Sequence, residues 1–258
     1  MDLFVLLKTV PDTVEELSVA ADNKSLDAEW LRFRLSDADE HAVEQALLLK
    51  EKHGGKVTVV ALDSPEVDEA LYAALAKGAD RAVKIPVDQT KLGSVAVARV
   101  FAEFLAPVVA ASPCLVLPGC QAIDDLEGEL GSLLAEALHL PYVGVVCGVS
   151  LEEGGNKVVV LKEFAGGVRG EFELSAPALL GIQSAEKPPR YVPVAKVRAV
   201  MKAAQIETAA VAEPDRAMAL DVERMYKPEA ASHAEMLEGS AEEIAAKLAD
   251  ILAERGIV

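Results

Sequence analysis

The chain has 258 residues, a formal net charge of −17 and 52% hydrophobic residues, with aromatic residues at only 4%. This acidity argues against binding to nucleic acids or to anionic membrane surfaces, and we find no apolar run as long as a membrane span. Because Leu3 to Leu7 follow the N-terminus without the basic start of a signal peptide, we expect an intracellular protein, cytoplasmic in a prokaryote or in the mitochondrial matrix of a eukaryote, with a prokaryote favoured.

The first 145 residues alternate between predicted strands and predicted helices. Strands are expected at 3–7, 57–62, 81–85 and 114–117, and helices at 36–53, 65–77, 93–111 and 127–138. Ser36 is expected to cap its helix with Asp39 three residues on, and Gly54 ends that helix. This alternation predicts an α/β fold with a mostly parallel, doubly wound sheet. Ligands of such sheets bind beyond the carboxyl ends of the strands.

The turn from Gly119 to Asp125 is the most informative segment. It lies between the apolar run Cys114 to Pro118 and a helix-like pattern from Glu127 to Leu138. A strand, a short polar turn and a helix N-terminus bring free backbone N–H groups and the positive end of a helix dipole together. We therefore expect an anion pocket here, where a nucleotide phosphate could bind.

After residue 145 the pattern changes to short strands separated by glycine-rich turns. These strands are expected at 143–151, 157–164 and 171–174. They predict a small antiparallel addition, after which Pro177 to Ile182 returns to the core sheet.

The C-terminal part predicts two further regions, so that the chain divides into a nucleotide-binding-type domain at 1–187, a loop and extended arm at 188–239, and a helix at 240–258. Prolines at 188, 189 and 193 favour extended backbone in the arm. Ser240 and Glu243 form a capping box before an amphipathic helix with an apolar stripe. We expect arm and helix to pack on a partner subunit; the alternative is a helix folded back on its own domain.

A basic segment runs against the overall charge. Its cations, with no acidic residue between them, are Lys187, Arg190, Lys196, Arg198 and Lys202. Apolar residues lie between them, so the segment predicts a docking element for an acidic partner with an apolar anchor. The alternative is an ordinary solvated loop.

The three cysteines and four histidines do not form a metal-ligand pattern. Cys114 and Cys147 lie in apolar runs and are expected to be reduced core residues, whereas Cys120 lies in the turn. No metal site and no catalytic residues are expected.

Several motifs occur in one order along nearly the whole chain. They are Leu7-Lys8-Thr9-Val10-Pro11-Asp12, Ala42-Val43-Glu44-Gln45-Ala46-Leu47, the run from Ala73 to Arg81, the turn Gly119-Cys120-Gln121-Ala122-Ile123-Asp124-Asp125, and Pro188-Pro189-Arg190-Tyr191 followed by Met201-Lys202-Ala203. This ordered set resembles the β subunit of electron transfer flavoproteins.

The resemblance implies an adenine-nucleotide α-hydrolase-like fold and a heterodimer with an α subunit that holds most of the FAD. The β subunit of this family usually carries a buried AMP and performs no bond chemistry. The complex shuttles electrons from flavin dehydrogenases, such as acyl-CoA dehydrogenases, to a quinone reductase.

The resemblance also implies residue roles. The cofactor-binding positions are Leu6, Ser36, Asp63, Gly119, Gln121, Ala122, Asp125, Gly128, Glu129, Leu130 and Gly131. The partner-recognition positions are Arg190, Tyr191, Val194, Val197 and Lys202.

The chain departs from the family pattern at the turn. Where members have Asn, Gln and Thr, it has Gly128, Glu129 and Leu130, which removes a hydroxyl and adds a carboxylate near the phosphate. A nucleotide-free structural subunit is therefore one alternative. Another is an electron-bifurcating relative with a second FAD, although the segment Asp124 to Gly131 does not match the turn of such relatives. The recognition loop also has about three extra residues before Met201.

Two unrelated classes are weaker alternatives. A stand-alone nucleotide-binding stress or signalling protein would need a glycine-rich loop at a strand–helix junction, and Gly166-Gly167 lies between hairpin strands instead. A hydrolase would need a nucleophile beside a base, and no such motif is found.

Overall fold

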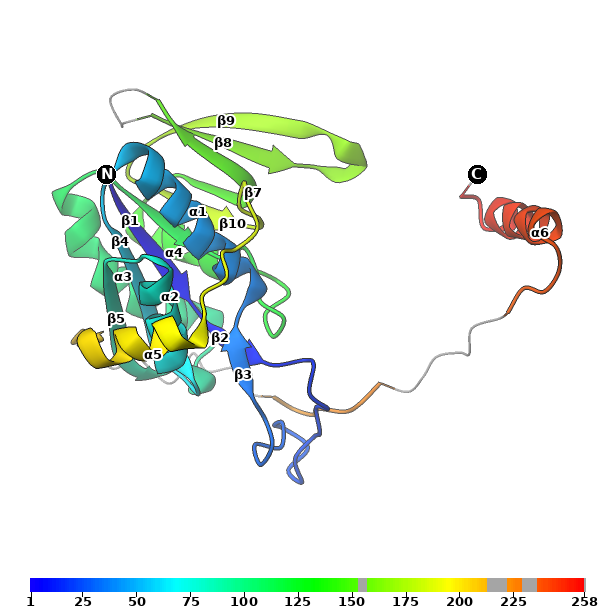
Figure 1. Ribbon diagram of the computed structural model, residues 1–258, viewed down its shortest axis with the longest axis horizontal. Coiled ribbons are helices and arrows are strands. Elements are labelled where there is room, and N and C mark those ends of the chain that lie inside the picture. The colour runs from blue at the N-terminus through cyan, green and yellow to red at the C-terminus, as the bar shows by residue number, and fades with distance from the viewer. Residues whose placement is uncertain (153–156, 213–221, 229–235, 258) are drawn as a thin grey trace.

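The computed structural model describes residues 1–152, 157–212, 222–228 and 236–257. Its main feature is a nine-stranded sheet with the strand order β11-β5-β4-β1-β6-β10-β7-β8-β9 (Figure 1). The strands are β1 (Asp2–Leu7), β4 (Val57–Asp63), β5 (Arg81–Asp88), β6 (Cys114–Pro118), β7 (Tyr142–Leu151), β8 (Lys157–Glu163), β9 (Arg169–Ser175), β10 (Ala178–Ile182) and β11 (Glu207–Thr208). A separate pair joins β2 (Thr9–Pro11) to β3 (Phe33–Leu35) in antiparallel fashion.

The central strands are buried on both faces. Every residue of β6 and β10 is buried, and so are five of the six residues of β1. The strands from β11 to β7 pair in parallel. The continuous apolar runs in the sequence therefore form strands that are covered on both faces, because a parallel sheet has helices on both sides.

Helices cover the two faces of this sheet. The helices α1 (Asp37–His53) and α2 (Val67–Lys77) pack into one apolar cluster, and α3 (Ser94–Ala111) and α4 (Leu130–Leu138) into the other. The expected α/β class with a mostly parallel, doubly wound sheet is confirmed. Short 3-10 turns lie at η1 (Gln89–Lys91) and η2 (Ala165–Gly167).

One helix corrects an expectation from sequence. By length and composition α3 could cross a membrane, although we expected no such run. Six of its residues are buried in the domain, among them Phe101 and Leu105, and α3 packs against α4. Part of its apolar character therefore belongs to the core of this domain.

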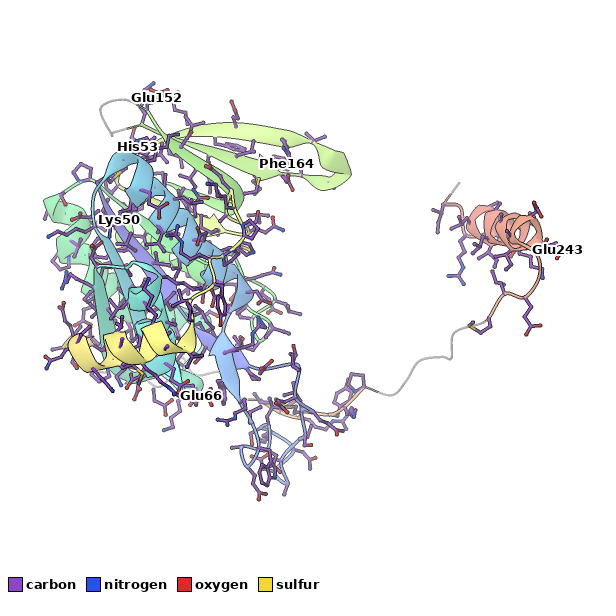
Figure 2. All side chains as sticks on the ribbon, in the orientation of Figure 1. Lys50, His53, Glu66, Glu152, Phe164 and Glu243 are labelled. Atoms are coloured by element: carbon purple, nitrogen blue, oxygen red, sulfur yellow. The ribbon has the colours of Figure 1, made fainter. Side chains whose placement is uncertain are left out.

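The antiparallel addition extends the main sheet. β8 pairs with β7 and β9 pairs with β8, both antiparallel, and the hairpin of β8 and β9 projects beyond the helices (Figure 1). Figure 2 shows Phe164 on this projecting hairpin, where its side chain is 46% exposed. The expected hairpin and the return of β10 to the core sheet are both present.

The segment after the sheet differs from the expectation of an irregular arm. Residues Val194–Ala203 form helix α5, which packs against α2, and β11 then adds a strand beside β5. Pro193 is the N-cap residue with φ −61°, so its ring fixes the backbone just before the first helical turn. The prolines favour extended backbone in the sequence, whereas the spacing of Val194, Val197 and Met201 is helical and decides the structure after Pro193.

The C-terminal helix α6 (Ala241–Glu254) has the expected capping box, with Ser240 and Glu243 bonded reciprocally. It has no buried residue, and it stands apart from the domain in Figure 1. Figure 2 places Glu243 at its first turn, far from the sheet. Packing of this helix on its own domain is therefore absent from the described structure.

Candidate functional site

The predicted anion pocket lies at the carboxyl ends of β1 and β6. The chain leaves β1 toward β4 on one side, and it later returns to β6 on the other, so the strand order reverses between these two strands. Such a reversal opens a crevice at the strand ends, where ligands of open α/β sheets bind. The turn that follows β6 covers this crevice.

Helix α4 begins later than the sequence pattern indicated. Its first residue is Leu130 rather than Glu127, and Gly128 before it has φ +63°. The turn closes on itself, because Ala122 and Asp125 exchange backbone hydrogen bonds of 3.2 and 3.0 Å. The segment between β6 and α4 is therefore a compact turn.

A cavity of about 30 Å³ remains beneath this turn. Seven of the predicted cofactor-binding residues line it, namely Leu6, Gly119, Gln121, Ala122, Asp125, Gly128 and Leu130. The structure therefore brings most of the predicted positions together around one small space.

Four predicted residues lie elsewhere. Ser36 lines a larger neighbouring pocket, and the Asp63 carboxylate lies 3.7 Å from the ammonium of Lys84. Glu129 is exposed at the N-cap of α4. A Cβ on Gly131 would lie 2.7 Å from the Tyr142 hydroxyl, so this glycine makes room for an aromatic ring.

Asp39 is a site residue that we missed. We had assigned it to the cap of α1, but Ser36 makes no side-chain cap bond, and Asp39 is instead 6% exposed in the crevice. Its carboxylate accepts the backbone N–H of Lys8 at 2.8 Å and that of Gly119 at 2.9 Å. Its position in the first turn of α1, opposite two strand ends, is a tertiary feature that spacing alone does not show.

The buried position of Asp39 changes its protonation. Burial raises its pKa to about 7, although the N–H groups of Lys8 and Gly119 act in the opposite direction. The Lys8 ammonium also lowers this pKa through its charge, and it forms an ion pair of 2.7 Å with Asp124.

The cysteines show no sign of reactivity. Burial raises the pKa of the Cys120 thiol, and it raises the pKa of Cys114 to about 11. A thiol with a raised pKa carries little thiolate at neutral pH. Within the described residues, no group of three or more His, Cys, Asp or Glu side chains could hold a metal ion.

A pocket of about 390 Å³ lies beside the small cavity and opens to the surface. Its lining includes Thr13, Ser36, His41, Gln121 and Gln183. It is formed by the start of α1, the end of β2 and the turn after β6, and it is the largest space that borders the predicted binding turn among the described pockets.

The predicted recognition segment is fixed to α1 by Arg190. Its guanidinium bonds to both carboxylate oxygens of Glu44 at 2.9 Å, and a third bond of 2.6 Å reaches Glu51. The Arg190 backbone N–H also bonds to Glu44. Burial raises the pKa of Glu44, but the bonds and charge of Arg190 outweigh it, so this pKa lies below its usual value.

The bonds of Arg190 to Glu44 and Glu51, which we call the Arg190 clamp, are continued by further hydrogen bonds along α1. His41 accepts the backbone N–H of Ala185 at 3.2 Å, and Gln45 accepts that of Glu186 at 3.1 Å. Side chains from successive turns of one helix therefore hold residues 185–190 in place before α5 begins. Arg190 was predicted as a partner contact, whereas the structure engages it within the chain.

The remaining recognition residues lie on or beside α5. Tyr191 is 84% exposed and Val194 is 60% exposed. Val194 and Val197 line a groove of about 410 Å³ against α2, and Lys202 is exposed at the end of the helix. Val194, Val197 and Lys202 therefore lie on one helix rather than on a loop, and Tyr191 lies three residues before its start.

Comparisons with known proteins agree with this architecture. The model of the family described as "Electron transfer flavoprotein domain" matches residues 28–216. An electron transfer flavoprotein subunit beta from Methylophilus methylotrophus is 31% identical over 267 residues, which covers 98% of this chain and 98% of that protein. The chain belongs to the electron transfer flavoprotein β-subunit family.

Further electron transfer flavoprotein β subunits show similar agreement. That of Syntrophomonas wolfei is 31% identical over 251 residues, covering 97% of this chain and 95% of that protein. That of Bacillus subtilis is 32% identical over 194 residues, covering 74% and 72%. The family name implies electron transfer, an association with flavin and a second subunit.

Proposed function

We propose that this chain is the β subunit of a heterodimeric electron transfer flavoprotein. It would shuttle electrons from flavin dehydrogenases, such as acyl-CoA dehydrogenases, to a quinone reductase. The FAD would be held mainly by the α subunit, and this chain would perform no bond chemistry. The compartment that we propose is the cytoplasm of a prokaryote.

The observation that carries the proposal is the unburied C-terminal helix in a chain that matches a relative along its whole length. α6 is capped and amphipathic, yet it buries no residue. Ile244, Leu248 and Ile251 lie on one stripe, and removing such side chains from water is worth about 1.5–3 kcal/mol each. A second subunit would supply the surface that this stripe needs.

Two surfaces would serve the carrier role. The pocket of about 390 Å³ near Thr13 would face the flavin of the partner subunit. α5 would present Val194 and Tyr191 to the dehydrogenase, with its position set by the Arg190 clamp. Since α5 has no acidic residue, its positive charge would speed the encounter with an acidic partner.

The test is co-expression with an α-type subunit, followed by purification of the complex and a count of released flavin. About one FAD per heterodimer and reduction by an acyl-CoA dehydrogenase would support the proposal. Absence of flavin and of a stable complex would overturn it, and about two FAD per heterodimer would favour the electron-bifurcating alternative.

A truncation gives a structural control for the heterodimer. Ending the chain after residue 212 keeps β11 and the contact of Val211 with the core, and it removes the arm and α6. We expect the truncated chain to fold normally and to bind the α subunit at least about 100-fold more weakly. Association equal to that of the full chain would contradict the role of α6.

A nucleotide-free structural β subunit is a second candidate, and one specific observation favours it. The cavity under the binding turn measures about 30 Å³, which does not match the AMP that the family pattern led us to expect in this subunit.

A further inference from the structure

The strand-end cavity is far too small for a nucleotide. Pockets for small organic ligands measure roughly 300–1,000 Å³, whereas a single water needs about 10–15 Å³. At about 30 Å³, this cavity has room for one or two waters. Leu6, Phe101 and Leu130 supply its apolar walls.

Two backbone donors at this crevice are already used. The N–H groups of Lys8 and Gly119 lie just beyond the ends of β1 and β6, in the crevice where ligands of such sheets bind. Both donate to the two carboxylate oxygens of Asp39, at 2.8 and 2.9 Å. A Cβ on Gly119 would lie 2.4 Å from Asp39 Oδ1, so nothing can be inserted between this strand end and the carboxylate.

The charge of the cavity also disfavours a phosphate. Among the described residues that line it, Lys8 is the only cation, and its ammonium is paired with Asp124 at 2.7 Å. Asp39 and Asp125 contribute two carboxyl groups to the same lining. A dianionic phosphate at this place would find no unpaired cation among these lining residues, and it would be repelled by any charged carboxylate there, because the environment is partly dry.

The turn narrows the space above the cavity. Gly128 has φ +63°, and a Cβ there would lie 2.4 Å from the carbonyl oxygen of Cys120. Its backbone therefore lies directly against the start of the turn. Widening the cavity would require moving this turn and the N-terminus of α4 together.

One buried polar atom at the cavity has no hydrogen-bond partner, and it indicates what the cavity contains. The side-chain carbonyl oxygen of Gln89 is buried and has no hydrogen-bond partner among the described protein atoms. Gln89 lines the cavity, and a buried acceptor of this kind needs a donor. An ordered water can donate to Gln89 and fits the volume.

We infer that this cavity is a closed site, in which the Asp39 carboxylate takes the place of a nucleotide phosphate and an ordered water bonds to Gln89. The β subunit thus replaces the ligand expected for its family with its own side chain. The inference rests on the proposed function for its biological setting, because the complex is the form in which a nucleotide would be retained.

The first test is nucleotide analysis of the purified heterodimer. We expect about one FAD and less than about 0.1 AMP per heterodimer after denaturation and mass spectrometry. About one AMP, or a second FAD, would overturn the inference while leaving FAD-based electron transfer intact. If no FAD is released, the proposed function fails, and AMP titration of the isolated full chain still decides the inference.

That titration uses AMP at about 1 mM and follows the melting temperature of the full chain. The wild-type chain is expected to show no shift, and a concentration-dependent rise would overturn the closed site. Asp39→Ser removes the carboxylate and makes room, and we expect its AMP affinity to rise by at least about tenfold over wild type. Asp37→Ser, at an exposed position of the same helix turn, is the matched control and should behave as wild type.

An Asp39→Ser chain that folds and still binds no more AMP than Asp37→Ser would overturn the role of the carboxylate. If Asp39→Ser does not fold, the wild-type nucleotide count and titration decide between a closed and an open cavity.

Discussion

The central sheet and the C-terminal helix both have clear apolar patterns, but only the sheet buries its apolar residues within this chain. β10 buries all of its five residues within the chain, whereas α6 buries none. Leu248 and Leu252 of α6 remain 46% and 37% exposed. An apolar pattern therefore predicts that a face is buried, but not whether the same chain buries it.

The largest expected effect separates these two regions directly. Leu117 in β6 is 0% exposed, so Leu117→Ala should lower the free energy of unfolding of the isolated chain by about 2–5 kcal/mol. Leu248→Ala should change it by less than about 0.5 kcal/mol and should instead weaken binding to the α subunit. Urea unfolding of both variants measures the difference, and equal losses would mean that α6 packs on its own domain.

The closed cavity predicts a pH dependence of stability. The pKa of Asp39 is about 7 in the folded state, while an unfolded aspartate titrates near 3.9. The folded state holds this proton more tightly, so the stabilisation is fully present below pH ~4 and is lost as the pH rises through 7. The charged neighbours that act on Asp39 are Lys8 and Glu40.

Asp39→Asn cannot titrate. It should therefore flatten the fall in unfolding free energy between pH ~4 and ~7, by on the order of a few kcal/mol at most. Urea unfolding across this range checks it, with Asp37→Asn as the exposed control. A slope in Asp39→Asn equal to that of wild type would show that Asp39 is not the group responsible.

The clamp on α1 predicts a smaller effect, confined to electron transfer. Arg190→Lys keeps the charge but loses the planar pair of bonds to Glu44, so the position of α5 should loosen. We expect kcat/KM with the dehydrogenase to fall by about tenfold, with FAD content unchanged. Arg169→Lys is the control, because its bond to Glu163 is exposed on the hairpin. Equal rates for both variants would remove the positioning role of Arg190.

The smallest expected effect concerns the apolar anchor. Val194→Ala removes exposed apolar surface from the first residue of α5 and should slow transfer by about threefold, with normal FAD content. Alanine is preferable to glycine, because glycine in a helix costs about 1 kcal/mol by itself. Transfer at the wild-type rate in both Val194→Ala and Val197→Ala would exclude these valines as the anchor.

Much of the domain was predictable because its signals are local. Continuous apolar runs and glycine stops predicted the strands of the main sheet up to β10 and the helices α1 to α4 to within a few residues, since burial on both faces leaves no polar alternation. The short pair of β2 and β3 was not predicted. The helix α5 was missed because Pro193 breaks backbone hydrogen bonding and yet also starts helices well. Whether Pro193 ends the regular structure or starts a helix depends on whether the following residues can pack on a neighbouring element, here α2.

The binding turn combines, in a single site, features that are local in the sequence and features that depend on tertiary contacts. Sequence alone placed the residues from Gly119 to Leu130 beside a strand end and predicted an anion pocket, since a strand followed by a polar turn and a helix has that geometry. Only the tertiary structure brought Asp39 of α1 onto the amides of Lys8 and Gly119, far from it in the chain. Local order therefore determined the elements of this protein, whereas the volume and charge of its crevice were decided by contacts between elements that no spacing along the chain encodes.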